Sequence, residues 1–311
     1  MERVHRNERV AALLKILTDS PNRLFALSHF CQMFATAKST LSEDLELLRQ
    51  MLKTYDLGVL DSVAGPGGGV RFRPVMTAEG ALAFTRDLCA ELRAPWRLLP
   101  GGVLYMHDLL GDPRKVRRMA NLIAGRFYDV QPAFVLTVAA SGIPVALFTA
   151  EALGIPLVTA RRDHADPNPL FHSPVPGPAM PETPPVEKEA AASGSAAAGR
   201  TRRLSRTALR RWEDRLNPRG PHAMSLPRRA VREGQTGLIV DDFMSTGDTV
   251  KGMMDLLAGA GAGVAGAAVV AAAAGPARRL AADVLSLLVV DVDGEAGTFT
   301  VKPSEDIASL P

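Results

Sequence analysis

Two adjacent acidic residues followed by a small polar loop occur in the stretch GLIVDDFMSTGDTV, residues 237–250. An apolar run that ends in Asp241 and Asp242 predicts a buried strand with two carboxylates at its carboxyl end, the edge where parallel sheets bind ligands. Paired acceptors suit the vicinal hydroxyls of a ribose. The loop STGDT, residues 245–249, precedes a predicted helix, so its backbone N–H groups can converge on a phosphate. The stretch therefore predicts a ribose 5-phosphate site, and it lacks the Gly-Lys-Ser/Thr of a P-loop.

A second segment is built in the same way. Residues 135–146, VLTVAASGIPVA, consist of an apolar strand, the turn Ala140–Gly142 and a helix that begins at Ile143. Taken alone, each segment also fits an interpretation without a ligand. The first can be an acidic strand end with a helix-capping turn, and the second an ordinary strand-to-helix turn. Together they predict two ligand loops.

The elements that must position these loops alternate between helix and strand from residue 103 onward. Helices are predicted near 113–128, over 144–153 and from Thr249; strands are predicted over 133–140, 155–162, 236–242, 266–274 and 285–292. This alternation predicts an α/β fold, a parallel sheet with helices on its faces. Residues 75–96 are predicted to form a linking helix.

Residues 1–74 have a different pattern, three helices followed by a glycine-tipped hairpin. Apolar residues at helical spacing mark the helices, and Thr40 with Glu43 has capping-box spacing, which predicts a third helix starting near Ser39. These are the parts of a winged helix-turn-helix, whose third helix enters the major groove of DNA. The residues expected to contact DNA are Arg3, Arg6, Lys38, Ser39, Thr40, Ser42, Gly67, Gly68 and Arg71. The alternative is a three-helix packing module that does not bind DNA.

A biased segment interrupts the second half of the chain near residues 165–220. Its first part is rich in proline, alanine and serine, which predicts a low-complexity insert without a core. Residues 200–232 then contain eleven arginines, and 201–217 can form a basic helix. The arginines fit either an anion-binding flap or extra nucleic-acid contact, or simply a solvated insert.

Length and composition limit the number of domains and the class of protein. The 311 residues suffice for one large domain or two ordinary ones, and 47% hydrophobic with 22% charged residues is typical of a globular protein. The densest apolar stretch, Val264–Ala274, is too short to span a membrane, and the N-terminus lacks a signal-peptide core, so we expect a cytoplasmic protein. Cys31 and Cys89 have neither a disulfide framework nor zinc-ligand spacing, and no metal site is expected.

The stretch 237–250 closely resembles the phosphoribosyl pyrophosphate (PRPP) motif of type I phosphoribosyltransferases. The resemblance implies that Asp241 and Asp242 hold the ribose hydroxyls, that the loop 245–249 holds the 5-phosphate, and that the turn Ala140–Gly142 holds pyrophosphate. It also makes Phe243 a candidate for stacking on a purine base. The nucleotide-site residues are then Asp241, Asp242, Phe243, Ser245, Thr246, Gly247, Asp248, Thr249, Ala140, Ser141 and Gly142.

A winged helix joined to such a fold resembles the purine operon repressor family, PurR, of Gram-positive bacteria. The segments that carry this resemblance are AKSTLSEDL, VAGPGGGVRFRP, RLLPGG, GIPVA, HAMSLPRR and GLIVDDFMSTGDTVKGM. It implies a winged-helix DNA-binding domain over residues 1–74 and a phosphoribosyltransferase-like effector and dimerisation domain over 75–311. Ser141 stands where the family carries lysine, and Asp248 where many phosphoribosyltransferases carry glycine.

The resemblance further implies a homodimeric repressor of purine biosynthesis genes that binds double-stranded operator DNA. PRPP, with or without Mg²⁺, acts as the inducer, guanosine tetraphosphate competes for the same pocket, and no cofactor is tightly bound. Catalysis is not expected. The alternative is a catalytically active purine phosphoribosyltransferase that carries an N-terminal DNA-binding appendage.

Overall fold

The computed structural model describes residues 4–99, 103–162, 171–172, 224–227, 229–274, 283–293 and 298–308. Arg3 and the predicted basic helix over 201–217 lie outside the described residues. So does most of the predicted insert near 165–220, apart from the two-residue strand β7, Phe171–His172.

The N-terminal part has the predicted order of three helices and a hairpin. The helices are α1, Arg6–Thr18, α2, Leu27–Met33, and α3, Lys38–Thr54, and the hairpin strands are β1, Val59–Val63, and β2, Gly69–Arg73. Apolar side chains from all three helices and both strands fill one core, with Leu13, Phe30, Leu41 and Val70 fully buried. This arrangement is a winged helix, as predicted.

Helix α3 starts within one residue of the predicted position near Ser39, but without the predicted capping box. The helix begins at Lys38 after the extended residue Ala37, and no side chain caps it. Thr40 already lies inside the first turn, so the predicted capping box of Thr40 and Glu43 is wrong. Lys38 therefore stands at the helix N-terminus itself.

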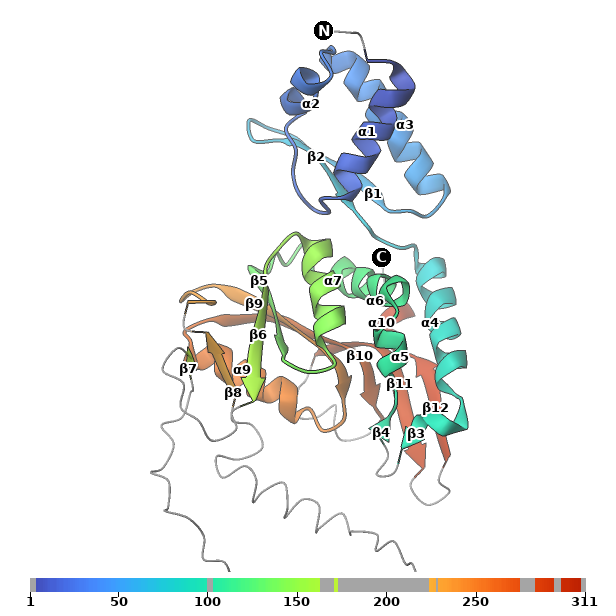
Figure 1. Cartoon of the computed structure of the whole chain (residues 1–311), viewed down its shortest axis with the longest axis vertical. Helices are drawn as coiled ribbons and strands as arrows, with labels where there is room; N and C mark the ends of the chain where they lie inside the picture. The colour runs from blue at the N-terminus through green and yellow to red at the C-terminus, as the bar shows by residue number, and fades with distance from the viewer. Residues whose placement is uncertain are drawn as a thin grey trace, which may run out of the picture.

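Thr77 marks the passage to the second part, since its hydroxyl caps α4, Ala78–Leu92, by accepting from the N–H of Gly80 at 3.1 Å. The Asp56 carboxylate, just past α3, accepts from the N–H and the hydroxyl of Thr77, both at 2.9 Å. Figure 1 shows the winged helix on one side of this junction and a sheet domain on the other.

The second part is built on an eight-stranded sheet in the order β12-β11-β10-β9-β5-β6-β8-β7. Five central strands, from β11 to β6, run parallel, and the outer strands are antiparallel. The strands are β5, Phe134–Val138; β6, Leu157–Arg162; β8, Met224–Pro227; β9, Thr236–Met244; β10, Gly263–Ala273; β11, Val284–Asp293; and β12, Thr298–Pro303. The predicted α/β fold is thus confirmed.

Helices cover both faces of this sheet (Figure 1). Helices α4, α6 (Pro113–Gly125) and α7 (Ile143–Leu153) pack on one face with the short α5, His107–Leu110, and α9, Asp248–Gly259, packs on the other. The remaining elements are the turn η1, Pro95–Arg97, the pair β3, Leu98–Leu99, and β4, Val103–Leu104, and the short helix α10, Glu305–Ala308. The helix predicted near 113–128 ends three residues early, at Gly125.

The sheet reverses its winding between β5 and β9. These strands are parallel neighbours, with Phe134 opposite Gly237 and Leu136 opposite Ile239, whereas the chain continues from β5 to β6 on one side and from β9 to β10 on the other. A crevice outside the carboxyl ends of two such strands is where open parallel sheets bind ligands. Both predicted loops, after β5 and after β9, are at this point.

Candidate functional site

The first predicted loop packs directly against the first acid of the motif. A Cβ placed on Gly142 would lie 2.5 Å from Oδ1 of Asp241 and 3.0 Å from Oγ1 of Thr137, so only glycine fits at this position. Gly142 is also the N-cap of α7. The fold therefore brings the turn Ala140–Gly142 and the carboxylate pair together, although about 100 residues separate them.

The carboxylate of Asp241 is almost fully enclosed. Asp241 is 5% exposed, and its Oδ1 accepts the backbone N–H of Asp242 at 3.0 Å, whereas Asp242 itself is half-buried. Burial first and the neighbouring Asp242 carboxylate second raise the pKa of Asp241 to about 7, and the Arg162 guanidinium opposes both. The two acids therefore differ. Asp242 is accessible to a ligand, whereas Asp241 is buried and has a pKa close to neutral pH.

Thr137 adds a polar group without a partner. It is 0% exposed near the carboxyl end of β5, and its hydroxyl makes no hydrogen bond within the described structure. Buried hydroxyls are nearly always paired, so an orphan beside a carboxylate and a loop marks a place where ligand or water completes the bonding. This observation independently supports a binding site between β5 and β9.

The second predicted loop has the geometry of a phosphate cradle. Gly247 adopts a left-handed conformation, φ 83°, and forms the N-cap of α9, which begins at Asp248. Ser245 and Thr246 are exposed, and the hydroxyl of Thr246 donates to Oδ2 of Asp248 at 2.7 Å. This bond holds the Asp248 carboxylate on the loop's own hydroxyl. The first N–H groups of α9 have no partner within the helix and favour an anion.

Arg162 is a residue of this site that the sequence analysis did not select. It ends β6, and its Nη2 donates to Oγ1 of Thr249, in the first turn of α9, at 3.1 Å. The sequence does indicate Arg162 as a site residue. The residues ARR at 160–162 end a predicted strand, and parallel strands end at the same edge of the sheet. Arg162 supplies a positive charge next to the predicted phosphate loop, where Ser141 offers none.

The other predicted residues of this site lie around it. Ala140 is exposed, Ser141 is half-buried, and Phe243 is partly buried against the core on the α7 side of the sheet. The stacking role of Phe243 stays a prediction. Among the described residues, no group of three or more His, Cys, Asp or Glu side chains is placed to hold a metal ion, and none of the helices is long and apolar enough to cross a membrane.

A second candidate surface lies on the winged helix. A groove of about 690 Å³ separates the start of α3 from the hairpin tip, and Lys38 and Gly68 line it from opposite sides with the N-terminal residues of α2. Ser39, Ser42 and Gly67 are exposed, and Thr40 is half-buried. The groove thus brings together Lys38 and Gly68 of the residues predicted to contact DNA, and the contacts with DNA stay predictions.

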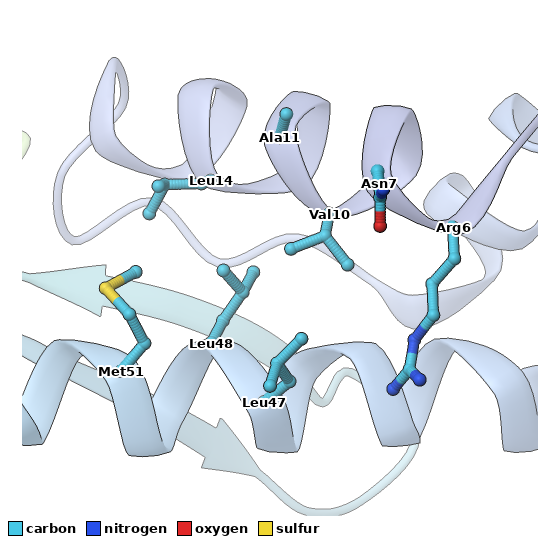
Figure 2. A pocket seen from close by; sticks show the side chains of 8 residues that line it. All are labelled: Arg6, Asn7, Val10, Ala11, Leu14, Leu47, Leu48 and Met51. Carbon is cyan, nitrogen blue, oxygen red and sulfur yellow. The ribbon is translucent and has the colours of Figure 1, made fainter.

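Two of the predicted arginines are tied to acids of their own domain. Arg6 reaches from α1 to the buried Asp44 of α3, with Nε 3.2 Å from Oδ1, and Arg9 binds the other oxygen of the same carboxylate. Figure 2 shows Arg6 at one end of a groove of about 450 Å³ between α1 and α3, with its side chain directed toward α3. Nε of Arg71 lies 3.5 Å from Oδ2 of Asp61 on the paired strand. The contacts of both arginines with DNA stay predictions.

Comparison with known families agrees with this division. The model described as "Bacterial purine repressor, N-terminal" matches residues 5–74, and the model described as "Phosphoribosyl transferase domain" matches residues 108–303. The second match spans β5, β9 and both loops.

Relatives extend over nearly the whole chain. The purine biosynthesis transcriptional activator PurR of Lactococcus lactis subsp. lactis is 31% identical over 286 residues, which cover 92% of this chain and 92% of that protein. The purine biosynthesis transcriptional repressor PurR of Bacillus subtilis is 32% identical, covering 92% and 87%. The probable purine biosynthesis transcriptional regulator PurR of Streptococcus pneumoniae serotype 4 is 31% identical, covering 94% and 95%. The resemblance drawn from the sequence is confirmed, and the chain belongs to the PurR family of purine biosynthesis transcriptional regulators.

Proposed function

We propose that this protein represses purine biosynthesis genes by binding operator DNA through its winged helix and that PRPP releases it. The observation that carries the proposal is the presence, in one chain, of a groove lined by Lys38 and Gly68 and of a close contact between Gly142 and Asp241 where β5 and β9 end. We assign residues 1–74 to DNA binding and residues 75–311 to effector binding and dimerisation.

The pocket suits PRPP group by group. Asp242, with Asp241 behind it, accepts from the ribose hydroxyls, and the loop 245–249 with the N-terminus of α9 receives the 5-phosphate. The turn Ala140–Gly142 receives the pyrophosphate, with the orphan hydroxyl of Thr137 nearby. Arg162 adds a cation to a site that must hold a polyanion, and Mg²⁺ carried in by PRPP neutralises more of that charge.

Repression and release follow from linkage. A ligand shifts the equilibrium between two states of a protein only by binding one state more tightly. PRPP must therefore favour a state that binds DNA with lower affinity. A homodimer places two winged helices on two half-sites of an operator, and a change in their spacing weakens both contacts together. Guanosine tetraphosphate, which like PRPP carries a ribose with phosphate and pyrophosphate groups and in addition has a purine base, would compete for the same site with its base against Phe243.

A binding titration tests the proposal. The wild-type protein first selects a high-affinity duplex from random-sequence DNA, and its affinity for that duplex is measured with and without PRPP and Mg²⁺. We expect PRPP to lower DNA affinity by about 5- to 150-fold, the usual range of allosteric coupling. The double variant Asp241→Ala with Asp242→Ala should bind the duplex and ignore PRPP. An unchanged wild-type affinity in the presence of PRPP would refute the proposal.

The same pocket supports a second candidate function, a purine phosphoribosyltransferase that carries a DNA-binding domain. The observations in its favour are the contact between Gly142 and Asp241 and the left-handed Gly247 at the start of α9. Against it, the relatives that span this chain are transcriptional regulators by name, so we propose a sensor without catalysis. Pyrophosphate release from PRPP in the presence of adenine, guanine, hypoxanthine or xanthine would establish the enzyme instead. Because those relatives include an activator, in vitro transcription from a bound promoter determines the sign of control.

A further inference from the structure

Helix α7 connects the two candidate sites physically. Its N-cap, Gly142, lies against Asp241 and Thr137 in the proposed effector pocket. Its last residue, Leu153, accepts a hydrogen bond from the side chain of Asn22, which belongs to the winged helix. A helix of 11 residues is about 16 Å long, so one stiff element spans the distance between pocket and DNA-binding domain.

Two side chains donate hydrogen bonds to the carboxyl end of α7. Helices end with carbonyls that lack intrahelical partners. Here the Asn22 amide donates to the carbonyl of Leu153 at 2.7 Å, and the Tyr128 hydroxyl donates to the carbonyl of Ala152 at 3.2 Å. Burial raises the pKa of Tyr128, which keeps that hydroxyl protonated as a donor.

Both of these side chains meet at one arginine of the wing. Nε of Arg73, at the end of β2, donates to Oδ1 of Asn22 at 3.3 Å, and its guanidinium carbon lies 4.6 Å above the centre of the Tyr128 ring. Arg73 is also paired with Asp61 of β1 at 3.2 Å. The contacts form a closed ring that joins the end of α7 to both strands of the hairpin.

The backbone around Asn22 is tightly fitted as well. Asn22 has a positive φ of 58°, a conformation asparagine tolerates, and its N–H donates to the carbonyl of Phe72 in β2 at 2.7 Å. A Cβ on Gly154, which ends α7, would lie 3.0 Å from the carbonyl oxygen of Pro21. The turn formed by Pro21 and Asn22 is therefore in close contact with both α7 and β2, and it moves when either element moves.

We propose that α7 transmits effector occupancy to the DNA-binding hairpin through the ring of contacts formed by Asn22, Tyr128 and Arg73. A ligand that fills the turn Ala140–Gly142 acts on the N-terminus of α7, because no space separates Gly142 from Asp241. A packed helix responds by shifting as a unit rather than by deforming. Its far end then moves the Asn22 turn and β2, whose residues lead to the hairpin tip. The inference rests on the proposed function, since it requires that PRPP occupy this pocket.

Two conservative variants open the ring at different bonds. Asn22→Asp keeps an acceptor for Arg73 and tolerates the left-handed backbone, but replaces the donor to Leu153 with an oxygen. Tyr128→Phe keeps the aromatic side chain beneath Arg73 and removes only the hydrogen bond from the Tyr128 hydroxyl to the carbonyl of Ala152. Asp129→Asn is the matched control, because it changes an almost fully exposed neighbour of Arg73 that is not part of the ring of contacts. Oδ1 of Asp129 lies 3.8 Å from Nη1 of Arg73.

The readout is the ratio of DNA affinities without and with PRPP, together with each affinity alone. We expect both variants to bind PRPP, and separately the selected duplex, within about twofold of wild type, while the ratio falls about three- to tenfold. Asp129→Asn should keep the wild-type ratio.

Three outcomes overturn the inference. If wild type responds to PRPP but both variants keep its ratio, α7 is not the coupling element and the proposed function stands. If a variant loses its ratio only because it no longer binds PRPP, the ring is merely structural. If wild type binds PRPP without any change in DNA affinity, the proposed function fails and the coupling fails with it.

Discussion

Gly142 and Asp241 are in contact across the switch point of the sheet, so closely that an added methyl group on Gly142 would lie 2.5 Å from the Asp241 carboxylate. One residue begins α7 and the other ends the apolar run of β9. Because the contact joins the turn after β5 to the carboxylate pair, both of which we propose to bind the ligand, changes to either residue should affect ligand binding and not only stability.

Gly142→Ala should weaken PRPP binding at least about tenfold, because a Cβ 2.5 Å from Oδ1 of Asp241 forces the turn away from that carboxylate. Isothermal titration calorimetry with PRPP and Mg²⁺ measures the effect. Gly125→Ala is the control, because a Cβ at Gly125, the last residue of α6, would have no atom within 4 Å. Wild-type affinity in Gly142→Ala would show that ligand does not use this turn.

Asp241→Asn should stabilise the ligand-free protein at pH 8 and do so much less at pH 4. With a folded-state pKa of about 7, Asp241 keeps its proton to higher pH in the folded chain than in the unfolded chain. Its contribution to the free energy of unfolding is therefore present below about pH 4, declines up to about pH 7 and is absent above. A neutral asparagine removes that decline, which amounts to no more than about 4 kcal/mol.

Urea unfolding at the two pH values tests this difference. Asp255→Asn serves as a control, since Asp255 is exposed and paired at 3.1 Å with Lys251 one turn away. Equal stabilisation by Asp241→Asn at both pH values would mean that the Asp241 carboxyl titrates normally.

Arg162→Ala should reduce PRPP affinity by about tenfold at low salt and by less at high salt, because an exposed cation beside a phosphate is screened by ions. The loss should exceed that of Arg114→Ala, which removes an exposed arginine of α6 outside both loops. If the two variants lose the same affinity, Arg162 contributes only to the overall charge.

Lys38→Ala should weaken binding of the selected duplex and lower the slope of log affinity against log salt by about one unit, as expected for one phosphate contact. Lys53→Ala provides a control on the same helix, since Lys53 lies in the last turn of α3, away from the groove. A salt slope unchanged in Lys38→Ala and lowered in Lys53→Ala would place DNA on the opposite end of α3.

Local patterns in the sequence predicted most of the fold and supplied the site hypothesis. The period of the apolar residues distinguished the helices from the strands, and the acid pair before STGDT indicated a ribose 5-phosphate site, which stays a prediction. The fold predictions are confirmed because helix and strand periodicity depend on residues within a few positions of one another. The start of α3 is the exception, since Lys38 begins the helix without the capping box that the spacing suggested.

Tertiary structure decided what lies beside what. Asp241 and Asp242 are equivalent in the sequence, but the packing of Gly142 and β5 buries the first and leaves the second accessible. Arg162 contacts Thr249, in the predicted phosphate loop, only because β6 ends at the same edge of the sheet as β9. Asn22 meets Leu153 although 131 positions separate them. Such contacts depend on strand order and on the docking of whole elements, which periodicity does not encode.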